Sequence, residues 1–550
     1  MPSSSLLADL SRALPDFLRN QRWFAGKAQN IEANEIVDII PMRSAPAAYL
    51  FLVRVEYAKV GAQTYAIPLS EALTTKVRWL QQPAVLSSPP HLDVKDPEGE
   101  GILTLVDAVW DESFLVTLLD AIGRGQVFRG RAGELRGIPT VAFKRLRGKA
   151  NAYLGPSIMK AEQSNTSIVY GGRLILKLFR RVAEGANPEV EVCSFLTERT
   201  SFANSPAVAG TLEYRQAEKE PVSLAVLQAF VPNQGDAWKY TLRALGDYFD
   251  RVATYGVDTI ELPSKPLLAL AREDSPPAAA ERIGAYLESA RKLGERTAEL
   301  HVALASGVRD AAFSPEPFST AYQQSVYESM VTLAAQNLEL LRRRSEHLPR
   351  EAQEVARAVL NREEEVVARF RGLLSQHLTG LRTRVHGDYH LGQVLYTGTD
   401  FVIIDFEGEP DRSIEDRRIK CSPLRDVAGM MRSFHYAAYS AVFDRMSGRG
   451  ELAEDNRDLD AWAQYWRTYV SAAFLKSYLS VVTQASLLPE DLRDLEALLD
   501  AYLLEKAVYE LGYELNNRPT WARIPLLGIL QILGGNGALK RRSRLAAEGF

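Results

Sequence analysis

The chain has 550 residues, of which 46% are hydrophobic and 24% charged, a balance typical of soluble globular proteins. A net charge of −4 argues against nucleic acid or anionic lipid as a partner, because both need a strong positive field. Two cysteines are too few for a disulfide framework. The sequence has no signal-peptide pattern and no 18-residue apolar run, so we expect a cytoplasmic protein that does not interact with a membrane.

The first hundred residues have the pattern of a small α+β unit. Leucines recur at helical spacing over residues 4–20. Strand-like alternation follows at residues 34–41 and again at 49–57. A helix that precedes several antiparallel strands indicates a compact unit of its own, which we place at residues 1–100.

Residues 160–179 combine a polar tract with a predicted hairpin. Gly171 and Gly172 separate two apolar runs, which is typical of a hairpin turn. Small hydroxyl and amide side chains before the first strand would let backbone N–H groups approach phosphate oxygens. These residues are Gln163, Ser164, Asn165, Thr166 and Ser167. The tract is not a G-x-G-x-x-G loop, so by itself it also fits an ordinary polar loop.

Lys177 lies in the second strand of this hairpin, within an otherwise apolar run. A buried, unpaired ammonium group is costly, so we expect an acidic partner for it. A helix begins near Asn187, a good N-cap, and acids follow in its first turn. We predict that Lys177 pairs with Glu191, one turn before Phe195, rather than with Glu189. The alternative is a lysine on an edge strand and a glutamate that serves only the helix dipole.

The chain leaves the predicted sheet after two further strands, at residues 211–214 and 222–227. In a two-lobed kinase this position is the hinge, whose backbone forms hydrogen bonds with adenine. Gln228 and Phe230 are therefore the expected nucleotide contacts. From Gly235 onward the pattern is overwhelmingly helical.

Residues 381–410 carry the clearest chemical pattern in the chain. Asp388 follows a His-Gly pair, and two short apolar runs at 394–396 and 401–404 predict a hairpin. One compact loop and hairpin would present a candidate base, Asp388, together with the oxygen ligands Gln393, Asp405 and Glu407. Phosphoryl transfer needs such a set, because the acceptor hydroxyl requires a base and Mg²⁺ prefers hard oxygen ligands. The alternative is a buried hairpin followed by a solvated acidic turn.

A predicted helix at residues 489–516 and the segment after it present aromatic and hydrogen-bonding side chains. Groups at positions i, i+3, i+4 and i+7 share one helical face. Such a face suits a sugar, which stacks its apolar side on aromatic rings and forms hydrogen bonds through its hydroxyls. The alternative is a polar face with two packed tyrosines. The residues are Tyr509, Glu510, Tyr513, Glu514, Arg518 and Trp521.

The motifs at residues 386–395 and 405–410 resemble those of the maltokinases, relatives of the aminoglycoside phosphotransferases with a eukaryotic-like kinase fold. The resemblance covers essentially the whole chain. It implies an α+β, two-lobed, protein-kinase-like fold with an extra N-terminal cap over residues 1–100. A β-rich part over residues 101–230 would complete the N-lobe. A mostly helical C-lobe over residues 231–550 would carry the catalytic loop and the acceptor site.

The resemblance also implies ATP-dependent phosphorylation of maltose to maltose 1-phosphate, with Mg²⁺ held by Gln393 and Asp405, and functional coupling to trehalose synthase. Gln393 stands where the wider kinase superfamily usually has asparagine, which extends the ligand by one methylene. We assign His390 to the substrate side. Supporting roles fall to His386, Arg425 and Asp426, of which Asp426 is expected to hold the catalytic loop. The sequence leaves glucosamine, another sugar, an aminoglycoside or a non-catalytic binding role as alternatives.

Overall fold

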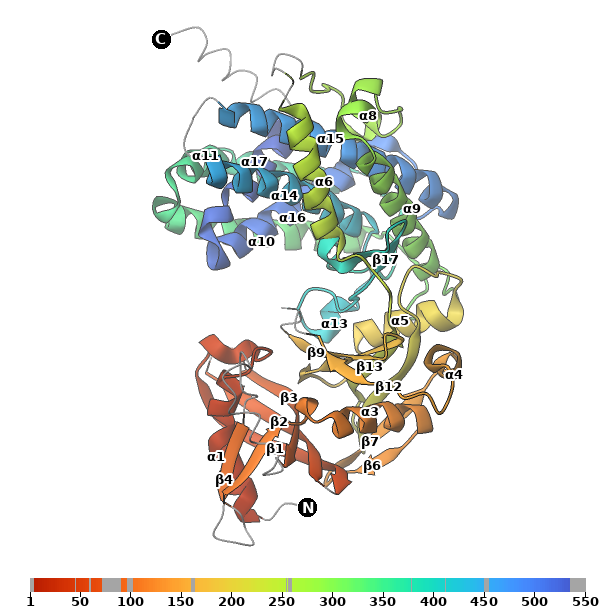
Figure 1. Ribbon diagram of the computed structural model, residues 1–550. Coiled ribbons are helices and arrows are strands. Elements are labelled where there is room, and N and C mark those ends of the chain that lie inside the picture. The colour runs from red at the N-terminus through yellow and green to blue at the C-terminus, as the bar shows by residue number, and fades with distance from the viewer. Residues whose placement is uncertain are drawn as a thin grey trace. The chain divides into compact units, whose positions relative to one another are not determined.

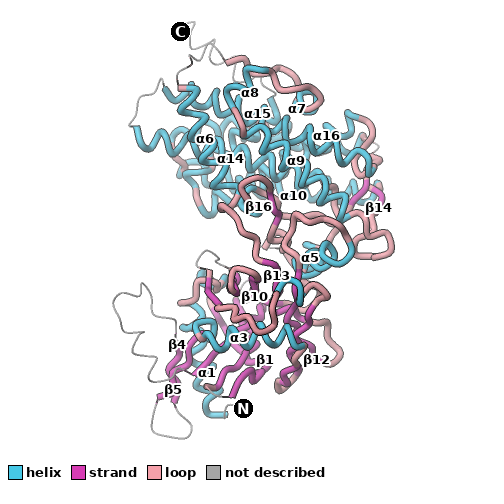
Figure 2. The backbone as a smooth tube through the Cα atoms, turned by 45° about the vertical axis from the view of Figure 1, so that its right-hand side comes forward, coloured by secondary structure: helices cyan, strands magenta, loops and turns pink. Residues whose placement is uncertain are grey.

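The computed structural model describes residues 4–44, 46–58, 61–71, 91–95, 102–159, 164–253, 255, 260–376, 378–410, 412–449 and 455–534. The chain divides into two compact units. The first comprises Met1–Glu198 and Pro206–Pro232, and the second comprises Arg199–Ser205 and Asn233–Phe550. Strands make up most of the first unit and helices most of the second (Figure 2).

The first unit begins with helix α1 (Ser4–Arg19), which confirms the predicted opening helix and packs against an antiparallel sheet (Figure 1). The strand order of this sheet is β1-β2-β3-β5-β4, and β11 pairs with β3. Its core joins Leu14 and Leu18 of the helix to Phe51 and Val53 of the sheet. The strands are β1 (Ile31–Ser44), β2 (Ala47–Tyr57), β3 (Gly61–Glu71), β4 (His91–Lys95), β5 (Ile102–Asp107) and β11 (Arg181–Val182).

A second sheet in the same unit has the strand order β6-β7-β12-β13-β10-β9-β8. Helix α3 (Glu112–Arg124) packs on β7, where a Cβ atom at Gly137 would lie 2.0 Å from the carbonyl oxygen of Ala121. The other helices of the unit are α4 (Phe143–Arg147) and α5 (Pro188–Arg199). The strands are β6 (Val127–Arg129), β7 (Gly133–Pro139), β8 (Pro156–Ile158), β9 (Asn165–Tyr170), β10 (Leu174–Phe179), β12 (Val208–Gln216) and β13 (Val222–Ala229).

Asp38, on β1 of the first sheet, connects the two sheets of this unit. Its side chain is buried and accepts hydrogen bonds of 2.6 to 3.1 Å from three consecutive backbone N–H groups at residues 131–133, between β6 and β7. The hydroxyl of Tyr214, on β12, donates a further hydrogen bond of 2.7 Å. The Asp38 carboxylate is therefore the acceptor for a buried tyrosine hydroxyl and for three partly buried backbone N–H groups.

Replacing Asp38 with alanine is expected to lower the free energy of unfolding by about 2–4 kcal/mol, because the buried Tyr214 hydroxyl and three partly buried backbone N–H groups would lose their acceptor. Asp38→Asn keeps one acceptor oxygen and should cost about half as much. Urea unfolding followed by circular dichroism measures both changes. Glu35→Ala, at an exposed position of the same strand, is the matched control. Equal stability of Asp38→Ala and the control would contradict this role.

The second unit is a helical assembly with two short antiparallel pairs of strands. Its core contains Trp466, Phe434, Phe474 and Tyr478. The helices are α6 (Ala237–Val252), α7 (Leu267–Leu270), α8 (Pro277–Ile283), α9 (Tyr286–Leu304), α10 (Thr320–Arg344), α11 (Arg350–Leu360), α12 (Glu363–Gly372), α13 (Ile414–Arg417), α14 (Leu424–Arg449), α15 (Asp455–Val482), α16 (Leu492–Asn517) and α17 (Arg523–Gly534). The strand pairs are β14 (Glu316–Pro317) with β15 (Leu381–Arg382), and β16 (Val394–Tyr396) with β17 (Phe401–Ile403).

Among the helices that the structure describes, none combines the length and the apolar character needed to span a bilayer.

Candidate active site

The loop after β15 is held by Asp426, in the first turn of α14. Its carboxylate is buried and accepts hydrogen bonds from the backbone N–H groups of His386, at 2.7 Å, and Gly387, at 3.0 Å. The buried ring of His301, on α9, lies 3.0 Å away through Nε2 and contacts the Tyr478 hydroxyl through Nδ1. The acid that was predicted to support the loop therefore lies in direct contact with its backbone.

Burial alone would raise the pKa of Asp426, but the side-chain hydrogen bond and charge of His301 and the hydrogen bond from the His386 backbone N–H outweigh burial and hold the pKa below 3.8. Because the pKa of Asp426 is depressed in the folded state, the ionised carboxylate stabilises the fold fully above about pH 4. This stabilisation is lost as the pH falls through the pKa that Asp426 has in the folded protein.

We therefore expect Asp426→Asn to lower the free energy of unfolding by about 2–4 kcal/mol at pH 7. The difference from the wild type should shrink as the pH drops below the ordinary aspartate pKa of 3.8. Urea titrations at pH 7, 5 and 3.5 measure it. Asp247→Asn, at an exposed position of α6, is the control. A stability difference that does not change with pH would rule out this electrostatic explanation.

His386 connects the catalytic loop to the acidic turn after β17. Its Nε2 donates to the carbonyl of Ile404 at 2.9 Å, and its Nδ1 accepts from the Asp388 N–H at 3.4 Å, a pattern that fits the neutral Nε2–H tautomer. Its ring lies 5.0 Å from that of Phe406. A Cβ atom at Gly387 would lie 3.4 Å from Cα of Gly408, so the two loops approach backbone to backbone.

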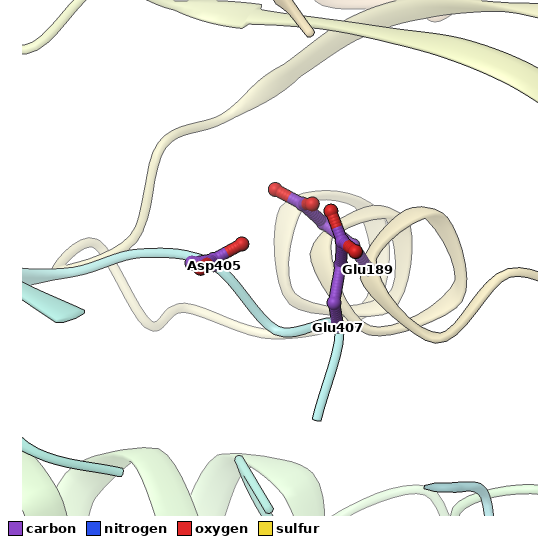
Figure 3. Close-up of side chains that lie close together, drawn as sticks. All are labelled: Glu189, Asp405 and Glu407. Atoms are coloured by element: carbon purple, nitrogen blue, oxygen red, sulfur yellow. The ribbon is translucent and has the colours of Figure 1, made fainter. Parts of the chain in front are cut away.

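The predicted hairpin forms from β16 and β17, and it places two of the proposed metal ligands at one end. The N–H of Ile404 donates to the carbonyl of Gln393, so Gln393 lies opposite Ile404, the residue before Asp405. Asp405 has φ +67°, a left-handed conformation that aspartate tolerates better than most residues. Carboxylate oxygens of Asp405 and Glu407 lie within 4.8 Å of each other (Figure 3). Two neighbouring carboxylates suit Mg²⁺, which prefers hard oxygen ligands.

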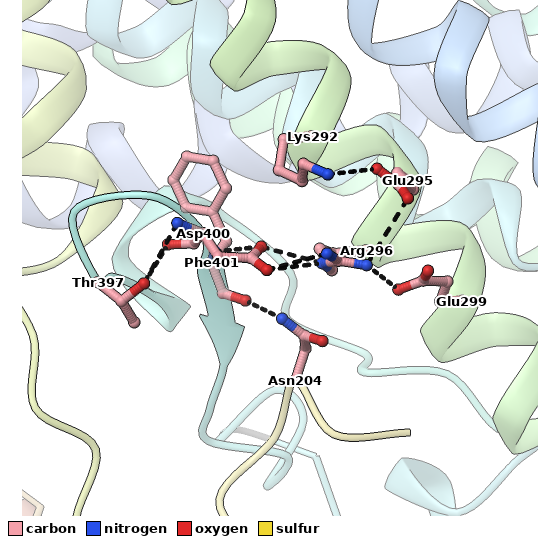
Figure 4. A network of polar contacts seen from close by, with 8 residues as sticks. All are labelled: Asn204, Lys292, Glu295, Arg296, Glu299, Thr397, Asp400 and Phe401. Atoms are coloured by element: carbon pink, nitrogen blue, oxygen red, sulfur yellow. Dashed lines mark hydrogen bonds and ion pairs between the residues drawn. The ribbon is translucent and has the colours of Figure 1, made fainter. Parts of the chain in front are cut away.

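The opposite end of the hairpin is fixed by α9. The guanidinium of Arg296 binds the carboxylate of Asp400 through two hydrogen bonds of 2.9 Å and also binds Glu299 (Figure 4). The Asn204 amide donates to the carbonyl of Phe401 at 2.8 Å (Figure 4). Bidentate arginine pairs fix orientation as well as distance. Arg296 therefore fixes the end of the hairpin that lies opposite Gln393 and Asp405.

Asp388, the predicted base, lies beside a lysine that the sequence analysis did not assign to the site. The Nζ of Lys506, on α16, is 3.5 Å from Oδ1 of Asp388 and 3.9 Å from Oε1 of Glu409. Glu409 is buried and also pairs with Arg412 and, at 3.2 Å, with Arg425. Arg425, predicted to be supporting, thus contacts the acidic turn.

A cavity within the second unit adjoins these residues, between α10, the catalytic loop, α14 and α16. Its lining includes Tyr509, the one residue of the predicted sugar face that reaches it. Its charged lining residues are three acids and three bases, namely Glu409, Asp426, Glu505, Arg412, Arg425 and Lys506. The charges of the cavity therefore balance.

His390 lies next to Asp388 as a neutral side chain. Its Nδ1 accepts from the N–H of Gly392 at 3.0 Å, and its Nε2 is 3.8 Å from Oδ2 of Asp388. Burial, together with the positive charge of Lys506, holds the pKa of His390 below 6.5 against the opposing charge of Asp388. At neutral pH the ring can donate one hydrogen bond from Nε2 on the side of Asp388.

The structure does not gather the predicted sugar face into one surface. Glu510 is in an ion pair of 2.6 Å with the buried Arg432 of α14. Glu514 is 1% exposed, accepts from the Tyr436 hydroxyl at 3.2 Å, and pairs with Arg518 at 2.7 Å. The prediction was wrong for these glutamates, because Arg432 and Tyr436, four residues apart on α14, face them.

Tyr513 and Trp521 lie farther along the chain from Asp388. Tyr513 is 47% exposed, and the guanidinium of Arg518 lies 4.7 Å above the Trp521 ring. Arg518 follows Lys506 by twelve positions, about 18 Å along a helix at 1.5 Å per residue. Tyr513, Arg518 and Trp521 therefore form a separate cluster that does not border the cavity beside the catalytic loop.

In the first unit, Lys177 pairs with Glu189, which corrects the predicted partner Glu191. The Nζ–Oε2 distance is 2.7 Å, and both side chains are largely buried. Lys177 lies on β10, between β13 and β9, so the edge-strand alternative is wrong as well.

The helical face of α5 explains the correct partner (Figure 3 shows Glu189 on this helix). Glu189 shares the buried stripe i, i+3, i+4, i+7 with Val192, Cys193 and Leu196, whereas Glu191 is only partly buried. The prediction counted Phe195 as the centre of that face and left out Cys193, which behaves as a small apolar residue.

The predicted phosphate-contacting tract is mostly a strand. Gln163 lies outside the described residues, and Ser164 precedes β9. Asn165, Thr166 and Ser167 are buried residues of β9, which corrects their placement in a loop. The strand begins early because β8 pairs with β9, and the Met159 N–H donates to the carbonyl of Ser167.

Thr166 belongs to a buried polar network. Its hydroxyl accepts from Nε of Arg180 at 2.9 Å, and Arg180 pairs with Asp107 at 2.8 Å. Arg180 is 1% exposed, and its guanidinium lies 4.8 Å from the Trp23 ring centroid. Thr166 therefore has a structural role.

The two predicted hinge contacts end β13. The Gln228 side chain is buried and donates to the sulfur of Cys193 at 3.3 Å. The Phe230 N–H donates to the carbonyl of Arg173 at 2.8 Å, so a contact of Phe230 with adenine would use its carbonyl group.

This fold, with its buried lysine–glutamate pair, supported catalytic loop and acidic turn, defines a small-molecule kinase of the phosphotransferase class. Residues 17–111 match the maltokinase N-terminal cap domain, and residues 160–408 match the phosphotransferase enzyme family. Residues 160–408 therefore belong to the phosphotransferase enzyme family, and the chain carries a maltokinase-type cap.

Two relatives are named glucosamine kinase. That of Streptacidiphilus jiangxiensis is 25% identical over 464 residues, covering 81% of this chain and 92% of the relative. That of Mycolicibacterium smegmatis is 24% identical over 389 residues, covering 70% and 81%.

Solved structures of glucosamine kinase show the same fold. One crystal form has a TM-score of 0.61 at 18% identity, covering 97% of this chain and 100% of that chain. A complex with glucosamine, ADP and inorganic phosphate has a TM-score of 0.59 at 18% identity, covering 97% and 99%. The predicted α+β, kinase-like fold with an N-terminal cap and a helical C-lobe is confirmed.

Proposed function

We propose that the protein transfers the γ-phosphoryl group of ATP to a hydroxyl group of maltose, releasing ADP and maltose 1-phosphate. The observation that carries this proposal is Asp388, held on a supported loop next to a cavity whose charges balance. The ADP in the solved complex of a related kinase supports the choice of nucleotide. We also propose that a trehalose synthase supplies the maltose.

In this mechanism Asp388 orients the acceptor hydroxyl and takes its proton as the oxygen attacks the γ-phosphorus, while the bond to the β-phosphate oxygen breaks. Lys177, oriented by Glu189, binds the α- and β-phosphates. Gln393, Asp405 and Glu407 would hold Mg²⁺, which when bound neutralises phosphate charge. Fixed geometry and charge, without a covalent intermediate, supply the rate.

A neutral acceptor is favoured because an ammonium group needs a local excess of negative charge. Glu409, the buried acid of the cavity, already pairs with Arg412, Arg425 and Lys506. Burial alone would raise the pKa of Glu409, but these three cations hold it below the ordinary value of 4.5, so the carboxylate is ionised and matched by positive charge. The maltokinase-type cap and the resemblance of residues 405–410 to maltokinases support maltose.

The second candidate acceptor is glucosamine. It is supported by the names of the relatives and of the solved structures. The same residues would perform the same transfer, and only the contacts with the sugar would differ.

We expect ATP consumption in the presence of Mg²⁺ to be fastest with maltose in a panel that also contains glucose, glucosamine and an aminoglycoside. A coupled ADP assay measures kcat/KM for each acceptor, and Asp388→Asn gives the background rate. The position of the new phosphate on the product follows from ³¹P NMR. A higher kcat/KM for glucosamine would replace maltose as the acceptor, and no turnover with any sugar would overturn the proposal.

A further inference from the structure

The ammonium group of Lys506 lies where two carboxylates and an aromatic ring favour a cation. Its Nζ lies 3.5 Å from Asp388, 3.9 Å from Glu409 and 4.7 Å from the ring centroid of Tyr509. Two carboxylates and an aromatic face are the groups that bind ammonium ions in proteins. The lysine reaches this position from α16, far along the chain from both acids.

The contacts of Lys506 with the two acids are electrostatic and not tight hydrogen bonds. Both distances exceed 3.2 Å, the usual upper limit for an N–H···O hydrogen bond. Its side chain is 22% exposed, so the ammonium group borders the space that an acceptor would enter. A ligand in that space would meet a positive charge next to the base.

We propose that Lys506 is a specificity-determining residue: its ammonium group occupies the place where the ammonium group of an amino sugar would find its counter-charges, and it thereby selects a neutral acceptor. This inference rests on the proposed function, because it presupposes that Asp388 receives the proton of a sugar hydroxyl.

The selection has an attractive and a repulsive part. In the wild type an amino sugar would bring a second positive charge close to Lys506, which is unfavourable in a partly desolvated site. Without that lysine, Asp388 and Glu409 lose one counter-charge, which an ammonium-bearing sugar can replace. We therefore expect removal of the charge to raise the ratio of kcat/KM for glucosamine to kcat/KM for maltose by about 10- to 100-fold.

The test compares Lys506→Met, which keeps most of the side-chain volume without the charge, with Lys506→Arg, which keeps the charge. The matched control is Lys476→Met, since Lys476 is another lysine of the second unit paired with an aspartate, Asp274. Selectivity is measured as the ratio of the two kcat/KM values. Binding of glucosamine and of maltose is measured separately by calorimetry, so that a loss of turnover does not hide a change in recognition.

The expected result is tighter glucosamine binding and a raised ratio in Lys506→Met only, with wild-type selectivity in Lys506→Arg and Lys476→Met. An unchanged ratio and unchanged glucosamine binding in Lys506→Met would overturn the inference, as would the same shift in Lys506→Arg. If the wild type phosphorylates no sugar, the proposed function fails. The calorimetric comparison then still decides whether Lys506 excludes an ammonium group.

Discussion

Replacing Asp388 with alanine is expected to lower kcat by about 10²–10⁴-fold, because the acceptor hydroxyl loses the group that orients it and takes its proton. Asp388→Asn should be nearly as inactive, since an amide keeps the shape of the side chain but accepts no proton at neutral pH. KM for ATP should change little, because Lys177, the lysine that we propose to bind the ATP phosphates, belongs to the first unit. Steady-state kinetics with ATP and maltose measure both constants.

The loss should occur in a folded protein. Asp388 is partly exposed. The Lys506 ammonium group lies 3.5 Å away and the neutral His390 ring 3.8 Å away, so replacement of Asp388 should move the melting temperature by only a few degrees. Asp274→Asn is the matched control, because Asp274 also pairs with a lysine, Lys476, but is almost fully exposed and lies on a different surface. Undiminished turnover by purified Asp388→Ala would exclude Asp388 as the base.

The part of the site that sequence could predict is local. Asp388, Gln393 and Asp405 belong to one loop and hairpin of about 20 residues, so short-range turn and strand patterns fix their proximity. Asp426 was also predictable, since only the short helix α13 separates the acidic turn from the helix that carries Asp426.

The long-range partners were not predictable in the same way. Lys506 reaches Asp388 from a helix more than 100 positions later, and no periodicity in either segment indicates that contact. The sequence does contain a signal for the contact between α14 and α16. Arg432 and Tyr436 on α14 have the same four-residue spacing as Glu510 and Glu514 on α16. In the structure Arg432 pairs with Glu510, and Tyr436 pairs with Glu514. Matching charged faces between helices would have shown that the two glutamates point into the protein.

Two predictions in the first unit needed correction. Glu191 was preferred to Glu189 as the partner of Lys177 because it lies one turn before Phe195, but the buried face of α5 also includes Cys193 and Glu189. Asn165 and Ser167 were placed in a loop because their side chains are polar. In β9 the backbone pairs with strands on both sides, and strand pairing outweighs low strand propensity.

Asp405 combines a charge with an unusual backbone conformation, and the two must be separated in any test. At φ +67°, alanine would add backbone strain to the loss of the carboxylate, whereas asparagine tolerates the left-handed region. Asp405→Asn is therefore the variant that reports on charge. Glu415→Gln, an exposed charge removal on α13, is the control for a general change in potential.

We expect Asp405→Asn to lower kcat at least about 10²-fold, the scale of losing one preorganised electrostatic group, and to raise the Mg²⁺ concentration needed for half-maximal activity. The amide keeps one neutral oxygen, which binds a hard cation more weakly than a carboxylate. Calorimetric titration of ADP with and without Mg²⁺ gives a readout independent of turnover, and Mg²⁺ should strengthen ADP binding less in the variant than in the wild type. If Asp405→Asn keeps the Mg²⁺ dependence of the wild type in both measurements, the carboxylate does not bind the metal, and the acidic turn acts only through its contacts with the catalytic loop.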